Sequence, residues 1–400
     1  MTTKCDVLII GGGSTGSSIA YHLARKGITD SIIAERGNQI ASGQTSKSTA
    51  LIRTHYTVPT VAKMAVKSLG FFQNFESELN GRSCGFKLTG LLLCADSTWE
   101  KDLSENSKML EGLGIESRII DSKVTESIEP CLDVNRFSTI VYEPNSGYAD
   151  PSLTASAFSN AAVEIGSRIL TRTEVLSVKK MASGDYLSET SNGEIEANKV
   201  VIANGVWSKN LLGRLGINPI PIKPVRHPVA IFRRPDEYSG TRPLIFDFPR
   251  KAYYKPEGKS QLYVGSVEIE LDTSRGEVDP DHYEQDVSFE EISRFSSSIS
   301  ECIPVMGSKG SFQTSYTGVY DVTPDQQPVI DELSDEGYEG LFCLIGLSGH
   351  GFKLCPEFGR IMADLIVNGN FTDYDISMFN RKRFAEGKLL KSKYGLGTIG

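Results

Sequence analysis

Several features that mark particular classes of protein are scarce in this sequence. Its seven cysteines are scattered through 400 residues without a CxxC pair or another metal-ligand spacing, which indicates a reducing, intracellular setting and no metal site. No apolar run approaches the roughly 18 residues of a membrane-spanning helix. The apolar stretch at residues 7–10 is too short for a signal-peptide core. We therefore expect a cytoplasmic chain without a membrane span.

Positive charge is also in short supply. Lysine and arginine number 42 against 50 aspartates and glutamates, for a formal net charge of -8. A nucleic-acid-binding protein normally carries a basic face, so we expect no nucleic-acid partner. The hydrophobic set makes up 39% of the chain, which is enough apolar material for two domains of ordinary size.

A glycine-rich turn near the start has the pattern of a nucleotide-binding site. The stretch "CDVLIIGGGSTGSSIAYHLARKG" predicts a short buried strand, a turn and an amphipathic helix. In such a turn Gly11 permits the tight bend, Gly13 lets the backbone approach a pyrophosphate, and Gly16 lets the helix pack closely on the strand. The free N–H groups at the start of the helix, near Ser14 and Thr15, favour phosphate oxygens.

The residues after this turn support a dinucleotide ligand. A second strand, Ser31–Ala34, ends in Glu35, about 20 residues past the turn, where a carboxylate accepts hydrogen bonds from ribose hydroxyls. Glu35 disfavours NADP because its charge repels a 2′-phosphate, although the neighbouring Arg36 weakens that argument. The unit does not by itself distinguish FAD from NAD.

A polar loop follows, and two interpretations of it stay open. It either wraps a second phosphate and a flavin ring or forms a solvated linker. Its hydroxyl residues are Thr45, Ser46, Ser48 and Thr49.

Further along, the pattern alternates between helix and strand. An amphipathic helix is predicted for residues 61–79, and short strands begin at residue 174 with Asn192-Gly193 as a hairpin turn. That meander ends in a buried strand at residues 200–203. Residues 221–318 are again rich in strands, predicted at 227–234, 243–248, 251–255 and 261–269. They also contain a helix that Ser288 opens, with Glu291 as its capping-box partner.

Taken in order, seven stretches resemble the D-amino-acid-oxidase-like flavoprotein superfamily, and within it the sarcosine oxidase, dimethylglycine dehydrogenase and L-proline dehydrogenase group. They are "VLIIGGGSTGSS", "IIAER", "TEVLSV", "KVVIANGVWS", "GVYDVTPDQQPVID", "GLSGHGFKLCPEFGRIMADLI" and "MFNRKRFAEGKLL". The resemblance implies an α/β fold with α+β insertions. Residues 1–90, 145–220 and 319–390 would form a Rossmann-type FAD-binding domain, and residues 91–144 and 221–318 a mostly antiparallel substrate-binding domain.

The same resemblance implies noncovalent FAD in an extended form, with adenine near Val175 and pyrophosphate at the first glycine turn. A second glycine turn precedes a helix at residues 352–367, whose positive end would face the part of the flavin that is negative when reduced. Relatives that bind FAD covalently have a cysteine where this chain has Gly318. The expected cofactor-binding residues are Gly11, Gly13, Ser14, Thr15, Gly16, Glu35, Arg36, Thr45, Ser46, Ser48, Thr49, Val175, Ala203, Asn204, Gly205, Trp207, Gly346, Gly349, His350, Gly351, Phe352 and Lys353.

Four residues form the expected catalytic set, again by resemblance. Arg53 and Lys353 match two cations that hold the substrate carboxylate in sarcosine oxidases, one as a planar fork and one as a point charge. Tyr254 and Tyr320 match tyrosines of the substrate pocket, although a tyrosine on a strand more often serves packing alone.

Three more residues bear on the chemistry. His55 and His227 are candidates for groups near the substrate amine, but a structural role is the simpler interpretation for each. Tyr263 stands where the related oxidases carry a lysine over the flavin that favours reaction with oxygen. Without that cation, another electron carrier is as good a candidate for the acceptor as oxygen.

The leading hypothesis is FAD-dependent oxidation of a small secondary or N-methyl amino acid such as sarcosine, dimethylglycine or proline. A hydride would pass from the carbon next to nitrogen to flavin N5, and the resulting imine would hydrolyse. The alternatives are a flavin dehydrogenase of a 2-hydroxy acid or glycerol 3-phosphate, an FAD-bearing subunit of a hetero-oligomeric electron-transfer complex, and an NAD-linked dehydrogenase. The last alternative leaves the motifs near the end of the chain unexplained. The chain is also a candidate subunit of a homo- or hetero-oligomer.

Overall fold

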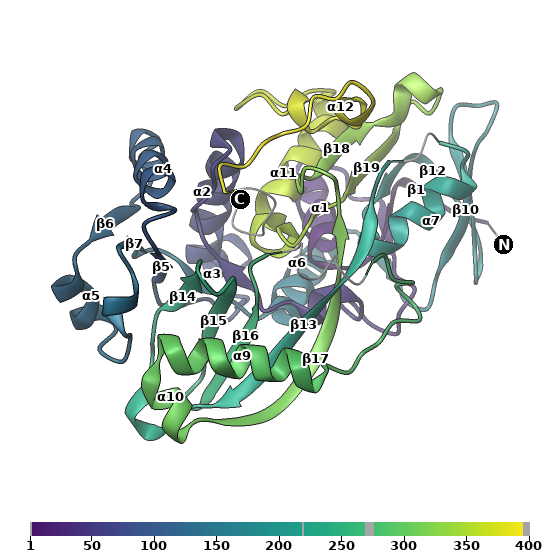
Figure 1. The fold of residues 1–400 in the computed structure, drawn as a ribbon. Helices are drawn as coiled ribbons and strands as arrows, with labels where there is room; N and C mark the ends of the chain where they lie inside the picture. The colour runs from purple at the N-terminus through teal and green to yellow at the C-terminus, as the bar shows by residue number, and fades with distance from the viewer. Residues whose placement is uncertain (1, 218–219, 269–275, 395–400) are drawn as a thin grey trace.

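The protein is described by a computed structural model that covers residues 2–217, 220–268 and 276–394. Two eight-stranded sheets and one three-stranded sheet form the framework, and helices cover their faces (Figure 1). No helix in these ranges is long and apolar enough to cross a membrane.

The first sheet is built around parallel strands, as the resemblance implies. Strands β9, β2, β1, β12 and β19 run parallel in that order, while β10, β11 and β18 are antiparallel to their neighbours. Their bounds are β1 (Thr2–Ile10), β2 (Ser31–Ala34), β9 (Arg168–Leu170), β10 (Val175–Lys180), β11 (Tyr186–Thr190), β12 (Gly193–Ile202), β18 (Val329–Glu332) and β19 (Leu341–Ile345).

Strand β12 differs from the expectation of two short strands. It runs without interruption for ten residues, because β1 pairs with it along its whole length, from Thr2 opposite Glu194 to Ile10 opposite Ile202. The first half of β12 also pairs with antiparallel β11, and the second half with parallel β19.

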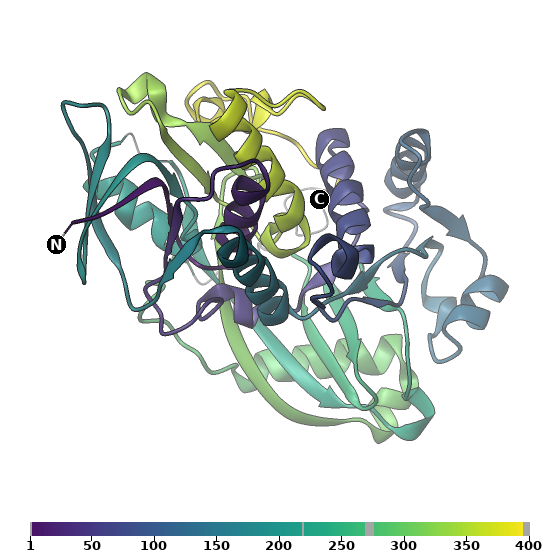
Figure 2. The same cartoon turned by 180° about the vertical axis from the view of Figure 1, so that it is seen from behind.

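Both faces of the first sheet are covered, which explains its continuous apolar strands. Val7 and Ile9 of β1 face a helical layer, whereas Leu8 and Ile10 face α7 and its neighbours. In the helical layer α1 packs against α6 and α11, and α11 packs against α2 (Figure 2). These helices are α1 (Ser14–Arg25), α2 (Pro59–Gln73), α6 (Pro151–Ile165), α7 (Ser208–Arg214) and α11 (Gly351–Asn368).

The amphipathic helix expected at residues 61–79 is two helices. Asn74, with φ -107° and ψ 17°, interrupts the helical backbone between α2 and α3 (Phe75–Glu78). Apolar residues recur at helical spacing on both sides of this break, so those of α2 and α3 face the same core.

The second sheet is mostly antiparallel, in the order β17-β13-β16-β15-β14-β5-β7-β6. Helices α9 and α10 lie across one of its faces (Figure 1), and the predicted capping box of Ser288 and Glu291 opens α9. The bounds are β5 (Leu91–Ala95), β6 (Arg118–Ile120), β7 (Thr139–Glu143), β13 (Lys223–Arg233), β14 (Leu244–Asp247), β15 (Ala252–Glu257), β16 (Gln261–Ser266), β17 (Ser311–Val322), α4 (Glu100–Gly112), α5 (Ser122–Ile128), α9 (Phe289–Cys302) and α10 (Pro304–Lys309).

The remaining elements are short. The expected strand at 261–269 ends at Ser266, and Ile269 lies outside the described residues. The third sheet is β3 (Leu51–Ile52), β8 (Gly147–Tyr148) and β4 (Lys87–Leu88); the last helix is α12 (Lys382–Ala385). The 3-10 helices are η1 (Gln44–Lys47), η2 (Val134–Arg136), η3 (Gly205–Trp207), η4 (Asp236–Tyr238), η5 (Leu333–Glu336) and η6 (Ser377–Phe379).

Candidate functional site

A cavity of about 570 Å³ lies at the carboxyl ends of the parallel strands. The last residues of β1 and β2, Ile10 and Ala34, line it together with Ala203 after β12. This is the edge where open α/β sheets bind ligands. The expected cofactor residues that line the cavity are Gly11, Gly13, Ser14, Thr15, Glu35, Arg36, Thr45, Ser48, Val175, Ala203, Asn204, Gly205, Trp207, Gly349, Gly351 and Phe352.

Six expected cofactor residues do not line this cavity. Gly16 lies beneath the first turn, where a Cβ atom would overlap the carbonyl oxygen of Gly11, so its role is to let α1 approach β1. Ser46 donates to the carbonyl oxygen of Gly43. The other four expected cofactor residues that do not line the cavity are Thr49, Gly346, His350 and Lys353.

The first glycine turn is tightly built. Gly11 has φ +110°, and a Cβ atom there would lie 2.6 Å from the carbonyl oxygen of Ala203. A side chain at this position would therefore be strained and would collide with β12. The backbone N–H of Ser14, at the start of α1, donates to Thr45 Oγ1 at 3.1 Å. The polar loop thus packs against the start of α1 and lines the cavity rather than forming a solvated linker.

Glu35 is held in place by backbone groups. Its Oε2 accepts a hydrogen bond from the N–H of Gly12 at 2.8 Å, and its Oε1 accepts one from Gly37 at 2.6 Å. The side chain is buried and still lines the cavity. A carboxylate oriented in this way is suited to accept hydrogen bonds from ribose hydroxyls.

Residues 276–288 cross the outer side of the cavity. No motif in the sequence predicted that this segment would line it. Pro280, Asp281, Tyr283 and Gln285 line the cavity from this segment. Asp281 pairs with Arg36 and accepts a hydrogen bond from Trp207 Nε1 at 2.9 Å. The Arg36 guanidinium also stacks over the Trp207 ring, 4.3 Å from its centroid.

Lys47 fastens the same segment from the polar loop. Its Nζ donates to the hydroxyl of Tyr283 and lies over the tyrosine ring. Tyr283 in turn donates to the carbonyl oxygen of Thr317 at 3.2 Å. Lys47, Asp281 and Tyr283 are thus cavity residues that the motifs did not identify, because they come together only through contacts between distant parts of the chain.

The second glycine turn joins β19 to α11, just as the first turn joins β1 to α1. Gly346, Ser348 and Gly349 all have positive φ, and a Cβ atom on Gly346 would overlap the methyl group of Thr323. Leu347, Gly349, Gly351 and Phe352 line the cavity. The start of α11 therefore lies at the cavity wall, with its positive dipole end nearby.

Arg53 and Lys353 lie close together in the interior. Both side chains are buried; Arg53 Nη1 donates to the carbonyl oxygen of His55, and Lys353 Nζ donates to that of Gly349 at 2.9 Å. Burial, together with the charge of Arg53, lowers the pKa of Lys353 well below its ordinary value. Burial also lowers the pKa of His350, with added repulsion from Lys353 and Arg53. Two neighbouring cations of this kind favour an anionic ligand.

The two expected tyrosines lie in different surroundings. Tyr320 lines the cavity and stacks on His227, with ring centroids 4.4 Å apart. Tyr254 does not reach the cavity: it is fully buried in the apolar cluster beneath α9 and donates to Asp247 Oδ2 at 3.1 Å. Alternation along β15 instead turns Tyr253 toward His227, whose ring it stacks on at 6.2 Å. Neither Tyr253 nor Tyr254 lines the cavity, but Tyr253 contacts His227, which stacks on the cavity residue Tyr320.

The two histidines also differ. His55 is completely buried, and its ring contacts Tyr394, Asn106 and Ser117, which agrees with a structural role. His227 lies between Tyr253 and the cavity residue Tyr320, although it does not line the cavity itself.

Asp321, next to Tyr320, is an acidic residue in the cavity wall that sequence reasoning missed. Burial raises the pKa of its carboxyl group to about 6. Its Oδ2 atom has no hydrogen-bond partner among the residues that the structure describes.

Tyr263 has a lysine nearby, although from another strand. Lys255 lies directly opposite it on β15, with Nζ 5.0 Å from the tyrosine ring centroid. The ammonium group is paired with Glu257 Oε2 at 2.8 Å, so its charge is largely compensated. Neither Lys255 nor Tyr263 lines the cavity.

Comparison with known proteins agrees with this geometry. The family model described as FAD dependent oxidoreductase matches residues 6–365. The chain belongs to this family. It is therefore an FAD-dependent oxidoreductase, and its fold is that of the family.

Individual relatives are distant but cover nearly the whole chain. Monomeric sarcosine oxidase from Bacillus sp. (strain B-0618) is 25% identical over 394 residues, which cover 96% of this chain and 97% of that protein. Human mitochondrial dimethylglycine dehydrogenase is 23% identical over 403 residues, covering 98% of this chain and 45% of that protein. The crystal structure of L-proline dehydrogenase from P. horikoshii superimposes with a TM-score of 0.87 at 25% identity, covering 98% and 100% of the two chains.

The residues present fit the cofactor of this family. The cavity wall contains a glycine turn that tolerates no Cβ at Gly11, the start of α1 at Ser14 and Thr15, and the anchored Glu35. Residues of the first turn and residues up to Phe352 after the second turn line one cavity, which also reaches Val175. Both glycine turns therefore border the same space. None of the seven cysteines lines it.

Proposed function

We propose that the protein oxidises a small secondary or N-methyl amino acid with FAD as oxidant. The observation that carries this proposal is the buried pair of cations, Arg53 and Lys353, behind the second glycine turn. Lys353 follows directly on Gly351 and Phe352, which line the cavity, so a carboxylate held by the two cations would lie beside the cofactor space.

The first glycine turn, Glu35, Trp207 and the polar loop would hold FAD without a covalent bond. When bound, FAD supplies a two-electron oxidant that accepts a hydride at N5 from the carbon next to nitrogen. We further propose that residues 1–90, 145–220 and 319–390 form the FAD-binding domain, and residues 91–144 and 221–318 the substrate-binding domain. These ranges include residues 218–219 and 269–275, which lie outside the described part.

The protein's own groups bind and orient the substrate. Arg53 offers a planar fork and Lys353 a point charge to the carboxylate. An anion between them would offset the repulsion that lowers the pKa of Lys353. His227, stacked between Tyr253 and Tyr320, provides an aromatic wall that is suited to a small alkylamine.

The relatives support this choice of substrate class. Sarcosine, dimethylglycine and proline, which appear in their names, all carry a carboxylate beside a substituted amine. A 2-hydroxy acid or glycerol 3-phosphate would satisfy the two cations equally well, so the amine is the group that a test must address.

Anaerobic bleaching of the bound flavin tests the proposal. Purified protein is mixed without oxygen with sarcosine, dimethylglycine and L-proline, and in parallel with lactate and glycerol 3-phosphate. We expect loss of the flavin absorbance with at least one amine and with neither of the others. Reduction by lactate or glycerol 3-phosphate alone would contradict the proposal, and bound FAD that no compound reduces would favour the role of an electron-transfer subunit.

Oxygen and a dye acceptor are then compared with the substrate that bleaches the flavin. Tyr263 in place of a lysine, and the pairing of Lys255 with Glu257, lead us to propose a carrier other than oxygen. Faster turnover with the dye than with oxygen is the expected result.

A further inference from the structure

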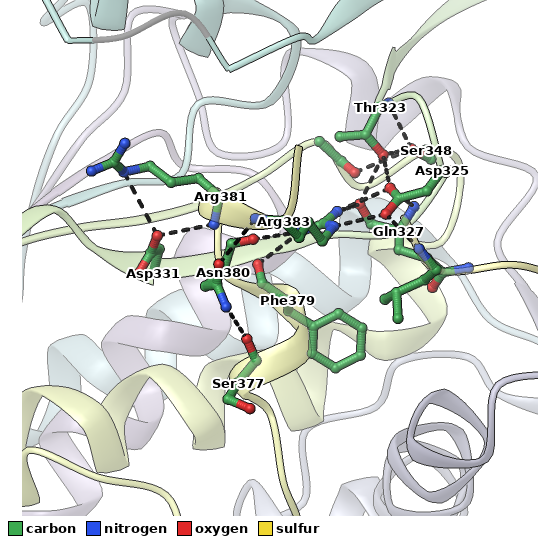
Figure 3. Close-up of polar contacts among 12 residues, drawn as sticks. Thr323, Asp325, Gln327, Asp331, Ser348, Ser377, Phe379, Asn380, Arg381 and Arg383 are labelled. Atoms are coloured by element: carbon green, nitrogen blue, oxygen red, sulfur yellow. Dashed lines mark hydrogen bonds and ion pairs between the residues drawn. The ribbon is translucent and has the colours of Figure 1, made fainter. Parts of the chain in front are cut away.

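A buried ion pair connects the end of the chain to the second glycine turn (Figure 3). Arg383 of α12 and Asp325 are 2% and 3% exposed. The guanidinium binds the carboxylate with two parallel hydrogen bonds, Nε to Oδ2 at 2.7 Å and Nη2 to Oδ1 at 3.0 Å. This bidentate geometry is the strong and directional form of such a pair.

Backbone groups satisfy the remaining atoms of the pair. Arg383 Nη1 donates to the carbonyl oxygen of Phe379 at 2.8 Å, and Nη2 donates to that of Gln327 at 2.8 Å. Asp325 accepts further hydrogen bonds from the N–H groups of Gln327 and Leu390, each at 3.2 Å. The pair therefore holds three separate stretches of chain together.

Thr323 carries this connection to the cavity. Its hydroxyl lies 3.2 Å from Asp325 Oδ1, and its backbone N–H donates to Ser348 Oγ at 3.2 Å. Its methyl group fills the space beside Gly346. Ser348 is completely buried and has a φ of 49°, which is an unfavourable conformation for a serine. Side-chain contacts from the Thr323 loop thus maintain the shape of the turn.

We propose that Arg383 is a positioning residue for the second glycine turn and thereby sets the redox properties of the bound flavin. The inference depends on the proposed placement of the flavin ring against Leu347, Gly349 and Phe352. Arg383 orients Asp325, Asp325 orients Thr323, and Thr323 holds Ser348. The start of α11 then keeps its positive end toward the ring and Lys353 toward the substrate carboxylate.

The test compares Arg383→Lys with a matched control, Arg381→Lys. Arg381 lies two residues away and pairs with Asp331, Asp335 and Glu336; no contact joins it to the second turn in the structure as described (Figure 3). The midpoint potential of the bound FAD is measured against reference dyes without oxygen, and acetate binding is measured from the change in flavin absorbance.

Arg383→Lys is expected to lower the midpoint potential, because a displaced helix start stabilises the reduced flavin less. It should also weaken acetate binding about tenfold, the equivalent of roughly 1.4 kcal/mol. Arg381→Lys should leave both quantities unchanged even where it lowers the melting temperature. A purely structural role for Arg383 would lower the melting temperature alone, and that result would overturn the proposal.

Thr323→Val keeps the test decisive if Arg383→Lys does not fold. Valine preserves the methyl contact with Gly346 and leaves the ion pair intact, but it removes the hydroxyl that links Asp325 to the turn. The same direction of change in potential is expected, and an unchanged potential in this variant would overturn the proposal. The midpoint potential is measured without substrate. Its change can therefore be interpreted even if the proposed substrate class is wrong.

Discussion

Lys353 is a buried ammonium group whose chemistry depends on its neighbour Arg53. Water does not reach it freely, and the adjacent guanidinium repels a second positive charge, so its pKa falls well below the ordinary value. A bound carboxylate would reverse the second effect. The protonation of this single residue should therefore be visible in the binding of anions.

We predict that the affinity for acetate falls as the pH rises through the lowered pKa of Lys353. The carboxylate pairs with the protonated lysine, which is fully present below that pKa and is lost above it. Lys353→Met should retain FAD, bind acetate about tenfold more weakly, and lose this part of the pH dependence. Titration of the flavin absorbance with acetate at several pH values measures both effects.

Lys199→Met is the matched control for this variant. Lys199 donates to the carbonyl oxygen of Ile366 near the other end of α11, so its loss should leave acetate binding unchanged. Equal acetate affinity in wild type and Lys353→Met would show that Lys353 does not hold the carboxylate.

Two adjacent tyrosines of β15 provide a second test at this scale. Tyr253 faces His227 and is expected to contact the substrate side, whereas Tyr254 donates to the buried Asp247. Tyr253→Phe should lower kcat/KM by about tenfold, the effect of one lost hydrogen bond, with little change in melting temperature.

Tyr254→Phe should show the opposite pattern. It removes one hydrogen bond to the buried Asp247, which keeps Arg250 as a partner, and should reduce the free energy of unfolding by about 1 kcal/mol with kcat/KM unchanged. Steady-state kinetics and thermal unfolding of both variants show which of the two tyrosines contributes to turnover and which to stability. A larger kinetic defect in Tyr254→Phe would mean that the sequence resemblance, not the strand geometry, identified the right tyrosine.

At the scale of elements, the segment of residues 276–288 has the contacts of a cover over the cofactor space. It carries no helix or strand of its own. The N–H of Val278 donates to Pro224, and Arg226 donates to the carbonyl oxygens of Glu284 and Asp286. Between these two anchors, side chains of Lys47, Arg36 and Trp207 fasten the segment, and such a stretch opens more readily than a strand in a sheet. Its fastening should therefore control how fast FAD leaves.

We predict that Asp281→Ala speeds the release of FAD roughly threefold, since exposed ion pairs contribute up to about 1 kcal/mol. His282→Ala is the control, because that side chain is 85% exposed and contacts only Asp279 among the ion pairs found. The fluorescence of released FAD after dilution measures the rate. Equal rates of FAD release from Asp281→Ala and His282→Ala would show that residues 276–288 do not retain the cofactor.

The unit of β1, the first glycine turn and α1 is the part of the fold that the sequence predicted best, together with helix α11 after the second glycine turn. Apolar residues and glycines in short stretches determine these elements, since each pattern depends on local backbone geometry. Strand β19, which precedes the second turn, was not predicted. The merger of two expected strands into β12 was not predictable in this way, because β1 imposes it from 192 residues away in the chain.

At the scale of the whole molecule, the proposed FAD site is formed by segments that are far apart in the sequence. The cavity wall is drawn from residues 10–48, 173–214, 280–285, 319–321 and 347–352. A ligand that binds only this assembled state stabilises it by mass action.

We predict that FAD at 100 times its dissociation constant raises the free energy of unfolding by about 2.7 kcal/mol. Since Gly318 offers no thiol and no cysteine lines the cavity, unfolding should release all the cofactor. Acid precipitation should leave a colourless pellet and a yellow supernatant. A yellow pellet would show a covalent bond to the flavin.

The sequence by itself predicted the family and its FAD cofactor, and comparison with known proteins confirmed both, because motifs in a recognisable order carry the resemblance. The phosphate-binding turn and the pair of cations remain predictions. Only the tertiary structure decided that Tyr253 rather than Tyr254 faces His227, that Asp281 covers Trp207, and that Arg383 reaches Asp325. These outcomes depend on strand alternation and on contacts between residues 58 and 74 positions apart. No local pattern encodes such contacts, since they form only when the sheets and helices have packed.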